Sequence, residues 1–192
     1  VWYVSYGSNM AAARFACYLE GGALPGAAHV NPGARDATPA KRAVGVELPG
    51  TVYFAGSSPT WGGGVAFYDP DTAGRTAARA YLVTAEQFAD IASQEMHRDP
   101  DVDHDLSGVL EHGRIALGPG RYETILLLGE RDGLPMLTFT APERHEHLLA
   151  PPAPAYQHVL SQGLREAFGW PDDRIAAYLD ALPGADGGQP RS

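Results

Sequence analysis

The sequence predicts a single-domain α+β protein, and three observations support this. Strand-like stretches rich in β-branched and aromatic residues alternate with helical stretches. The chain has 192 residues, close to the size of one domain, and its content of 44% hydrophobic and 19% charged residues is that of a globular protein. No internal repeat or linker divides it. We therefore expect one domain over residues 1–183 and a disordered tail over residues 184–192.

Short apolar runs bounded by turn residues predict the strands. They cover residues 1–5, 51–55, 64–68, 77–83, 113–116, 122–129 and 136–141. Turn signals such as Asp69-Pro70-Asp71 separate the second, third and fourth runs, which indicates an antiparallel meander. Arg131-Asp132-Gly133 lies between the last two runs and predicts a hairpin.

Capping signals and helical spacing predict the helices. Ser8 or Asn9 can cap a helix over residues 10–19. Thr84 followed by Gln87 matches a capping box, and the helix that it starts carries Glu95 on its apolar stripe. Two further helices are expected over residues 155–168 and 171–182, with Pro171 in the first turn of the second.

Charge and composition exclude several classes of partner. The net charge is -9 and the basic residues are scattered, which argues against nucleic acid because phosphate binding needs clustered Lys and Arg. No apolar run approaches the roughly 20 residues that cross a bilayer, and no basic leader precedes an apolar stretch. We therefore expect a cytoplasmic protein that binds neither nucleic acid nor membrane. The single cysteine, Cys17, is expected to be a small core residue.

The turn at Tyr6-Gly7-Ser8-Asn9 is a candidate ligand site. Successive backbone N–H groups in a glycine-containing turn that opens a helix can converge on an anion, where the helix dipole adds a positive partial charge. The same pattern also fits an ordinary strand-to-helix turn that Ser8 or Asn9 caps.

Glu95 is the candidate for proton transfer. A carboxyl group on an apolar stripe is partly buried, burial disfavours its charged form, and such a group suits proton transfer near neutrality. The alternative is that Glu95 lies at a frayed helix end and faces solvent. Trp61 beside Gly62, Gly63 and Gly64 gives an aromatic side chain next to backbone that a ligand can approach closely.

Two clusters that resemble metal sites lack the required spacing. The acidic residues between Asp99 and Asp105 lack the glycine and the terminal glutamate of a calcium loop. His145 and His147 are two apart, whereas the metalloprotease helix needs histidines four apart. We therefore expect no metal site.

Four segments, in this order, resemble the γ-glutamylcyclotransferase family. They are Tyr6-Gly7-Ser8-Asn9-Met10 at the N-terminus, Thr60-Trp61-Gly62-Gly63-Gly64, then Ala92-Ser93-Gln94-Glu95, and a proline-rich segment that leads to Tyr156 and Gly163-Leu164. The first motif is the most specific of the four. The match spans most of the chain but excludes residues 21–49 and the tail.

The resemblance implies a mixed β-barrel with peripheral helices and an intramolecular reaction. In this family the α-amine of a γ-glutamyl group attacks its own γ-carbonyl, which gives 5-oxoproline and releases an amine or amino acid. Glu95 would be the catalytic proton carrier, and neither a metal nor an organic cofactor is implied. The small-molecule γ-glutamyl substrate would be bound by Tyr6, Gly7, Ser8, Asn9, Met10, Trp61, Gly62, Gly63 and Tyr156.

The sequence departs from the family at two places. Met96 follows Glu95 where the family commonly has glycine. Residues 21–49 form a long irregular insertion, either a cover that selects substrates or a passive surface loop, and their Gly, Pro and Ala content offers little apolar area to a core. Two other functions stay open: a non-catalytic binding module on the same fold, or an amidase that uses the same pocket.

Overall fold

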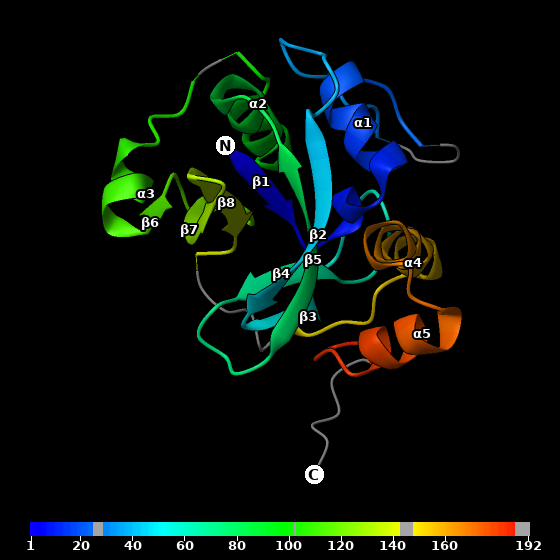
Figure 1. The fold of residues 1–192 in the computed structure, drawn as a ribbon. Helices are drawn as coiled ribbons and strands as arrows, with labels where there is room; N and C mark the ends of the chain where they lie inside the picture. Colours follow the sequence, from blue (N-terminus) through cyan, green and yellow to red (C-terminus); the bar gives the residue numbers. More distant parts are fainter. Residues whose placement is uncertain (25–28, 102, 143–147, 187–192) are drawn as a thin grey trace. The chain divides into compact units, whose positions relative to one another are not determined.

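A computed structural model of the protein describes residues 1–24, 29–101, 103–142 and 148–186. The helices in this part are the 3₁₀-helix η1 (Ser8–Met10) and the α-helices α1 (Ala12–Glu20), α2 (Ala85–Glu95), α3 (Ser107–His112), α4 (Pro154–Phe168) and α5 (Asp172–Asp180). The strands are β1 (Trp2–Ser5), β2 (Arg42–Pro49), β3 (Thr51–Ala55), β4 (Val65–Asp69), β5 (Arg75–Leu82), β6 (Arg114–Ala116), β7 (Thr124–Arg131) and β8 (Leu134–Thr140). The predicted α+β class is confirmed (Figure 1).

The strands form a mixed six-stranded sheet in the order β2-β5-β1-β8-β7-β6 and a two-stranded sheet of β3 and β4. β1 pairs with β8 in parallel, with Trp2 opposite Met136, whereas β7 pairs with both β8 and β6 in antiparallel fashion. β7 and β8 form the hairpin that the sequence predicted. Asp132 and Gly133 both have positive φ angles, as two-residue hairpin turns require.

The contacts of the chain group into two compact units. Unit 1 comprises residues 1–5, 13–44 and 80–142, and unit 2 comprises residues 6–12, 45–79 and 143–192. Each unit is therefore assembled from three separate segments, and β2 and β5 contribute residues to both units. The extent of the domain over residues 1–183 stays a prediction.

The core of unit 1 is aromatic. The Tyr3 ring lies 5.3 Å from the Phe139 ring and 5.8 Å from the Phe15 ring, between centroids, and Phe15 stacks on Tyr81 at 3.9 Å. Phe88 of α2 packs against Tyr3 at 6.2 Å. These contacts join β1, β5, β8, α1 and α2 around one cluster of buried side chains.

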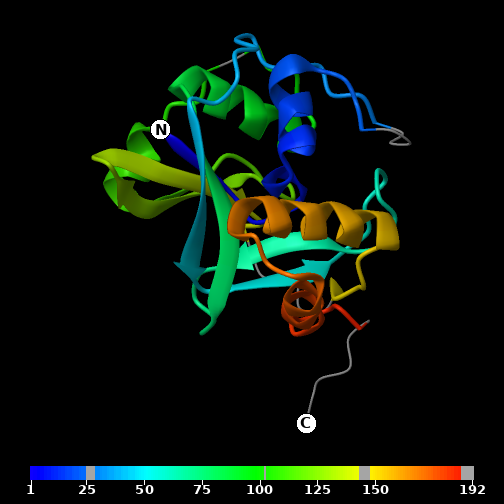
Figure 2. The same ribbon diagram turned by 45° about the vertical axis from the view of Figure 1, so that its right-hand side comes forward.

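Unit 2 is built on the β3–β4 hairpin, with α4 and α5 beside it (Figure 2). The N–H of Phe54 donates to the carbonyl of Pro183 at 2.8 Å, and the N–H of Ala77 donates to the Tyr178 hydroxyl at 3.0 Å. Gly184 is buried against the carbonyl of Phe54. The predicted disordered tail is thus wrong for residues 184–186, because they form a turn that packs on β3; residues 187–192 lie outside the described part.

Several sequence predictions of elements need correction. β5 is not the third strand of a meander, because it pairs in the six-stranded sheet while β3 and β4 form their own sheet. The predicted irregular insertion extends too far, since β2 begins at Arg42 and ends at Pro49. The short helix α3 was not predicted. The first helix begins at Ala12, because Asn9 belongs to the preceding 3₁₀ turn.

Residues 29–41 are anchored to α2 by polar groups. Both the backbone N–H and the Nε of Arg35 donate to the carboxylate of Asp90, which is fully buried. Gln87 also donates to the carbonyls of Asp36 and Thr38, at 3.1 and 2.8 Å. The segment is therefore attached through hydrogen bonds, even though it offers little apolar area.

Among the described residues, no helix has the length and apolar character that crossing a membrane requires.

Candidate functional site

The candidate ligand turn lies in unit 2, immediately after β1. The N–H of Met10 donates to the carbonyl of Gly7 at 3.0 Å and the N–H of Ala11 to that of Ser8 at 3.1 Å, which closes the 3₁₀-helix η1. Gly7 has a φ of -113°, which other residues also adopt. A Cβ at this position would lie 3.3 Å from the Tyr156 hydroxyl, so space rather than backbone conformation favours glycine.

Tyr156 of α4 is the residue on which the predicted binding segments converge. Its hydroxyl accepts from the N–H of Ala66 at 3.2 Å and lies beside Gly7. Its ring centroid is 5.5 Å from that of Trp61. Gly63 forms an isolated β-bridge with Pro152, just before α4. Three segments that are far apart in sequence are therefore brought together in unit 2.

The Trp61 loop requires its glycines. Gly62 and Gly63 have φ angles of 70° and 67°, which side chains disfavour. A Cβ at Gly63 would also come within 2.5 Å of the Pro151 carbonyl. The Ser58 hydroxyl accepts from the N–H groups of Thr60 and Trp61, which fixes the start of the loop.

The residues of the predicted turn differ in how deeply they are buried. Tyr6, Asn9 and Met10 are buried, whereas Gly7 and Ser8 are half-buried. Tyr6 packs on Tyr68 at 5.6 Å between ring centroids. The buried side chains therefore support the turn, and Gly7 and Ser8 are the accessible part of it.

A pair of charged residues that the sequence analysis missed holds the far end of the turn. Arg79 donates to the carbonyl of Met10 at 2.8 Å and to Glu166 at 2.6 Å, and Glu166 accepts from the N–H of Ala12 at 2.8 Å. The first turn of α1 is thus capped by Glu166 of α4. The predicted capping by Ser8 or Asn9 is replaced, because both residues lie in η1 and precede α1 by a turn.

Burial opposes ionisation of Glu166, but hydrogen bonds outweigh it. The N–H of Ala12, the Arg79 guanidinium and the Gln162 amide all donate to its carboxylate, so that its pKa lies below the ordinary value. Gln162 and Glu166 are four residues apart on α4, a spacing that could have indicated their contact in the sequence.

Glu95 is the last residue of α2, is half-buried, and belongs to unit 1. The predicted capping box at the other end of α2 is confirmed, with Thr84 and Gln87 bonded reciprocally at 3.0 and 3.1 Å. Glu95 also affects the ionisation of Tyr18, a residue of α1. Burial raises the pKa of Tyr18 well above its usual range, and the Glu95 carboxylate raises that pKa further.

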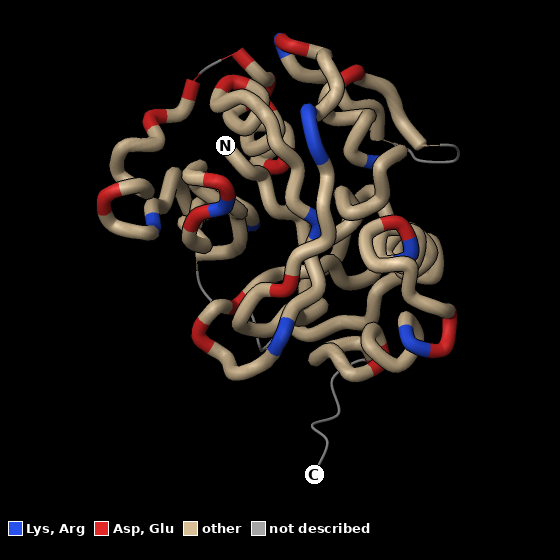
Figure 3. Tube along the Cα trace, in the orientation of Figure 1, with Lys and Arg blue, Asp and Glu red and all other residues tan. Residues whose placement is uncertain are grey.

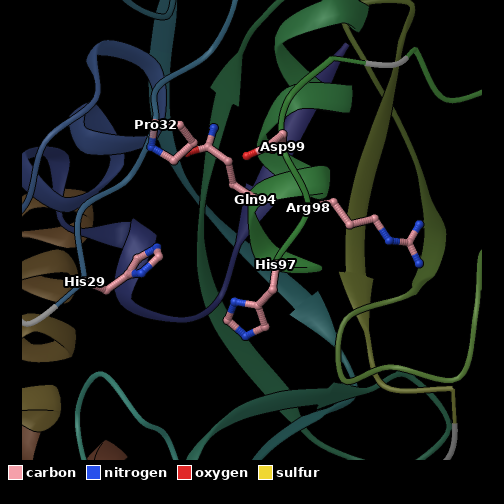
Figure 4. A pocket seen from close by; sticks show the side chains of 6 residues that line it. All are labelled: His29, Pro32, Gln94, His97, Arg98 and Asp99. Carbon is pink, nitrogen blue, oxygen red and sulfur yellow. The ribbon is translucent and has the colours of Figure 1, made fainter.

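A cavity of about 140 Å³ opens beside the end of α2 in unit 1 (Figure 4). It is lined by His29, Pro32, Gln94, His97, Arg98 and Asp99. The Arg98 side chain turns away from the other labelled groups and pairs with Glu123 at 2.7 Å. His97 has a φ of 58°, a left-handed conformation that ends the helix without a glycine.

Two of the acidic residues after α2 are bonded to other groups of the protein. Asp103 pairs with Arg35, and Asp105 accepts from the N–H of Ser107 at the start of α3. The described residues contain no group of three or more His, Cys, Asp or Glu that could hold a metal ion. His145 and His147 lie outside the described part. In that part, Lys and Arg are dispersed along the trace rather than gathered on one element (Figure 3).

Of the predicted site residues, the structure brings Gly7, Trp61, Gly63 and Tyr156 together within unit 2. Glu95 is a member of unit 1. Cys17 is buried, as expected for a core residue, and its thiol contacts the carbonyl of Ala13 at 3.4 Å.

No family model matches the sequence. The chain is 37% identical over 199 residues to the protein named histone deacetylase 5 of Arabidopsis thaliana, with 94% of this chain and 30% of that protein in the match. The chain therefore spans less than a third of the length of this curated relative.

The solved structures that match the chain have low sequence identity to it. One is a gamma-glutamyl cyclotransferase, at 16% identity and a TM-score of 0.46, which covers 100% of this chain and 92% of that one. Another is YkqA of Bacillus subtilis, at 16% identity and a TM-score of 0.49, which covers 95% of this chain and 55% of that one. A third is an uncharacterised human protein, at 17% identity and a TM-score of 0.44, with 95% and 88% covered. At such identities and scores, no residue role passes from those proteins to this chain.

Proposed function

We propose that the protein is a cyclotransferase that acts on γ-glutamyl amides and releases 5-oxoproline with an amine or amino acid. The proposal is supported by the four ordered motifs of the sequence and by the contacts of the residues that belong to them. The observation that carries it is the convergence on Tyr156: Gly7, Trp61 and Ala66 all contact this one side chain. Residues that are far apart in the sequence thus meet at Tyr156, which lies beside Gly7 of the predicted turn.

In the proposed reaction, one bond forms and one breaks within the same substrate. The α-amine attacks the γ-carbonyl carbon, the new carbon–nitrogen bond closes a five-membered lactam, and the amide bond to the leaving nitrogen breaks. Glu95 takes one proton from the α-ammonium group and returns it to the leaving nitrogen. The attacking nitrogen loses a second proton when the lactam closes, and the released amine carries that proton away as an ammonium group, so that no net proton is consumed. Because both reacting atoms belong to one molecule, positioning supplies much of the rate.

The turn would hold the charged or developing negative oxygens of the substrate. Backbone N–H groups of Gly7, Ser8 and Asn9 are the proposed donors. Among these residues, Gly7 and Ser8 are half-buried, so a ligand can reach their backbone. The Arg79–Glu166 pair fixes the other end of the turn, which keeps these donors oriented.

The test is a panel of γ-glutamyl peptides and γ-glutamyl amines, with release of 5-oxoproline measured by chromatography. Matched α-glutamyl peptides serve as controls, because their α-nitrogen is positioned differently relative to the scissile carbonyl. We expect 5-oxoproline from at least one γ-glutamyl substrate and none from the α-glutamyl controls.

The products also separate the alternatives. Free glutamate in place of 5-oxoproline would indicate an amidase, and saturable binding without any product would indicate a non-catalytic module. An acetyl-lysine peptide belongs in the same panel, because the curated relative is named a histone deacetylase. Deacetylation of that peptide, without 5-oxoproline release from the others, would contradict the proposal.

A further inference from the structure

The cavity beside the end of α2 has one wall that the insertion supplies, and hydrogen bonds fix this wall. His29 and Pro32 line the cavity, and the buried residue Asn31 lies between them in the chain. Oδ1 of Asn31 accepts from Nη1 of Arg14 at 2.7 Å. The backbone N–H groups of Asn31 and Gly22 donate to each other's carbonyls at 2.8 and 2.9 Å. This wall is therefore held in place from within unit 1.

Gln94 of α2 forms another wall, and its amide group is engaged by the protein. Nε2 donates to the backbone carbonyls of Tyr18 and Asp90, at 2.9 and 3.3 Å. Oε1 accepts from Nδ2 of Asn31 at 3.3 Å. A side-chain amide has two hydrogens, so Gln94 has no further N–H to offer to a ligand. The wall that Gln94 forms therefore does not favour an anion.

Asp99 gives the cavity a negative charge. Arg98 also lines the cavity, but its guanidinium pairs with Glu123 at 2.7 Å and turns away from the other labelled groups (Figure 4). Within the described part of the chain, the side chains of Asp99, His29 and His97 make no hydrogen bond or ion pair with another residue. An ionised carboxylate only accepts hydrogen bonds. The Asp99 end of the cavity therefore favours a cation that donates them.

The two imidazoles are set apart from the Asp99 carboxylate. Figure 4 shows that carboxylate pointing toward Gln94, whereas the rings of His29 and His97 lie away from it. Among the described residues, no three His, Cys, Asp or Glu side chains are arranged so that they could hold one metal ion. A ligand that meets all three groups must therefore have two separate polar ends. A neutral imidazole has one donor and one acceptor nitrogen, and a hydroxyl group can match either.

His97 occupies a position at which glycine is the usual residue. Its N–H donates to the carbonyl of Gln94 at 3.1 Å, and the N–H of Arg98 donates to that of Ser93 at 2.8 Å. These are the two bonds of a Schellman motif, and the φ of 58° that His97 adopts is one that side chains disfavour. Glycine would end α2 at a lower conformational cost. The histidine is therefore better explained by what its imidazole does in the cavity than by the end of the helix.

We propose that the cavity binds a small primary amine that carries a hydroxyl group. The ammonium group lies at Asp99, and the hydroxyl group lies at His29 and His97. The volume of about 140 Å³ limits the ligand to a few heavy atoms, because a cavity of roughly 150 Å³ holds a molecule of the size of benzene. The net charge of -9 also favours the approach of a cation over that of an anion.

Such an amine has two sources, a free amine and the amine that the proposed reaction releases. Both present the same ammonium group to the cavity. Glu95 follows Gln94 at the end of α2, so an amine that Glu95 protonates would be released beside the cavity. The binding of a free amine does not require the reaction, so the inference goes beyond the proposed function.

The test uses three probes of equal length, each titrated into the protein at pH 8 and followed by the NMR chemical shifts of the protein. They are 3-aminopropan-1-ol, n-butylamine, which lacks the hydroxyl group, and propane-1,3-diol, which lacks the ammonium group. We expect 3-aminopropan-1-ol to bind most tightly. Binding should be weaker by about 5-fold for n-butylamine and by about 10-fold or more for the diol.

Two variants assign the ends of the ligand. Asp99→Asn is expected to weaken binding of both amines by about 10-fold or more, because a neutral acceptor replaces a carboxylate. Asp101→Asn is the matched control, since it removes the same charge from an exposed residue that does not line the cavity. In about 0.15 M salt it should change binding by less than about 2-fold.

His97→Gly separates binding from stability. Glycine relieves the positive φ, so we expect an unchanged or higher melting temperature. Loss of the imidazole should weaken binding of 3-aminopropan-1-ol by about 5-fold but change that of n-butylamine by less than about 2-fold. Equal binding of both amines before and after the substitution would overturn the role of His97.

The outcomes separate this inference from the proposed function. Absence of binding by 3-aminopropan-1-ol, or equal effects of Asp99→Asn and Asp101→Asn, overturns the amine site. Inhibition of 5-oxoproline release by 3-aminopropan-1-ol that Asp99→Asn abolishes supports the site and assigns it to the released amine, and binding without inhibition supports it as a site for a free amine. A wild-type protein that is inactive on every γ-glutamyl substrate overturns the proposed function alone, because the titrations do not depend on turnover.

Discussion

At the scale of single residues, the Tyr156 hydroxyl limits which side chain position 7 accepts. Because the φ of Gly7 is ordinary, alanine there meets no backbone strain, but its Cβ would lie 3.3 Å from the hydroxyl. We expect Gly7→Ala to push the hydroxyl away from the Ala66 N–H, and we expect this to cost about 1–2 kcal/mol of unfolding free energy. Chemical denaturation measures that loss.

Tyr156→Phe provides the control for this prediction. Removal of the hydroxyl relieves the contact at position 7, so Gly7→Ala should cost much less in the Tyr156→Phe background than alone. Costs that simply add in the double variant would show that the hydroxyl is not what restricts position 7.

Glu95 gives the second prediction at this scale. Glu95→Gln keeps the size and one hydrogen-bond acceptor of the side chain but removes its ability to take a proton. We expect the melting temperature to change little and the rate of 5-oxoproline release to fall by roughly 100-fold or more. Glu111→Gln is a suitable control, because Glu111 is an exposed residue of α3 outside the candidate site. Near-normal turnover in Glu95→Gln would remove the proton-carrier role.

Some residues of the candidate site could be predicted from the sequence and others could not. Gly7, Trp61 and Tyr156 belong to local motifs, so the residues next to them in the sequence were enough to identify them. Glu166 and Arg79 lie in a helix and a strand that show ordinary surface patterns, and only the tertiary fold brings them to the turn.

At the scale of elements, the start of α1 depends on ionised Glu166. We expect Glu166→Gln to lower the free energy of unfolding by about 1 kcal/mol at pH 7, because a neutral acceptor binds Arg79 and the Ala12 N–H more weakly. The pKa of Glu166 is lowered in the folded protein, so its contribution is fully present above the ordinary glutamate pKa of 4.5.

The same contribution is lost as pH falls through the folded pKa, which lies below 4.5. Urea denaturation of both proteins across pH 3 to 7 measures this. The difference between wild type and Glu166→Gln should be constant at the upper end and shrink at the lower end. A difference that does not depend on pH would assign the effect to packing rather than to charge.

Gly163 gives the second prediction at the scale of elements, since it is where α4 packs on η1. A Cβ at this position would lie 2.5 Å from the Met10 Cβ and 2.7 Å from the Ala11 nitrogen. Replacing Gly163 with alanine gains about 1 kcal/mol of helix propensity. The overlap of the new Cβ with η1 costs about 1–3 kcal/mol or more, because backbone atoms must move to relieve it. We therefore expect a net loss of stability in thermal melts.

Gly108→Ala in α3 is the matched control. It makes the same exchange in a helix, but its Cβ would meet only the terminal methyl of Ile115, at 3.1 Å. This variant should be neutral or slightly stabilising. An equal loss in both variants would show that the contact with η1 is not the cause.

Elements with a strong local signal were predicted well. The capping box fixed the start of α2, and the Asp132-Gly133 turn fixed the β7–β8 hairpin. The predicted pairing of β5 was wrong. The periodicity of a strand indicates which of its faces is buried, but not which strands it pairs with. The helix α3 has only six residues and follows an acidic stretch. Six residues are too few to show the repeat of apolar positions that identifies a helix in a sequence.

At the scale of the molecule, the attachment of residues 29–41 gives the last prediction. Thr84→Ala removes the cap of α2 alone, for a cost of about 1 kcal/mol. Gln87→Ala removes the reciprocal capping bond and also the three bonds to Asp36 and Thr38, so we expect a cost of about 2–3 kcal/mol. Equilibrium unfolding of the two variants gives the comparison.

Equal costs for the two variants would show that the segment adds nothing to stability through Gln87. The expectation from composition was that residues 21–49 contribute little to the core. Composition describes apolar area well, but the attachment is polar and uses the buried Asp90 and Gln87, whose partners lie about 50 residues away. No local pattern in the sequence marks such contacts.

The assembly of each unit from three separate segments has a consequence for synthesis of the chain. The ribosome delivers the protein from its N-terminus, so every residue of unit 1 is present once Pro142 has emerged. The β3–β4 hairpin of unit 2 ends at Asp69, but α4, whose Tyr156 covers it, ends only at Phe168. At about 5–20 residues per second, the hairpin waits roughly 5–20 s for that helix. During that interval the Phe54 side chain lacks its contact with the Tyr156 ring of α4, so we expect a holding chaperone to protect the exposed hairpin of the nascent chain.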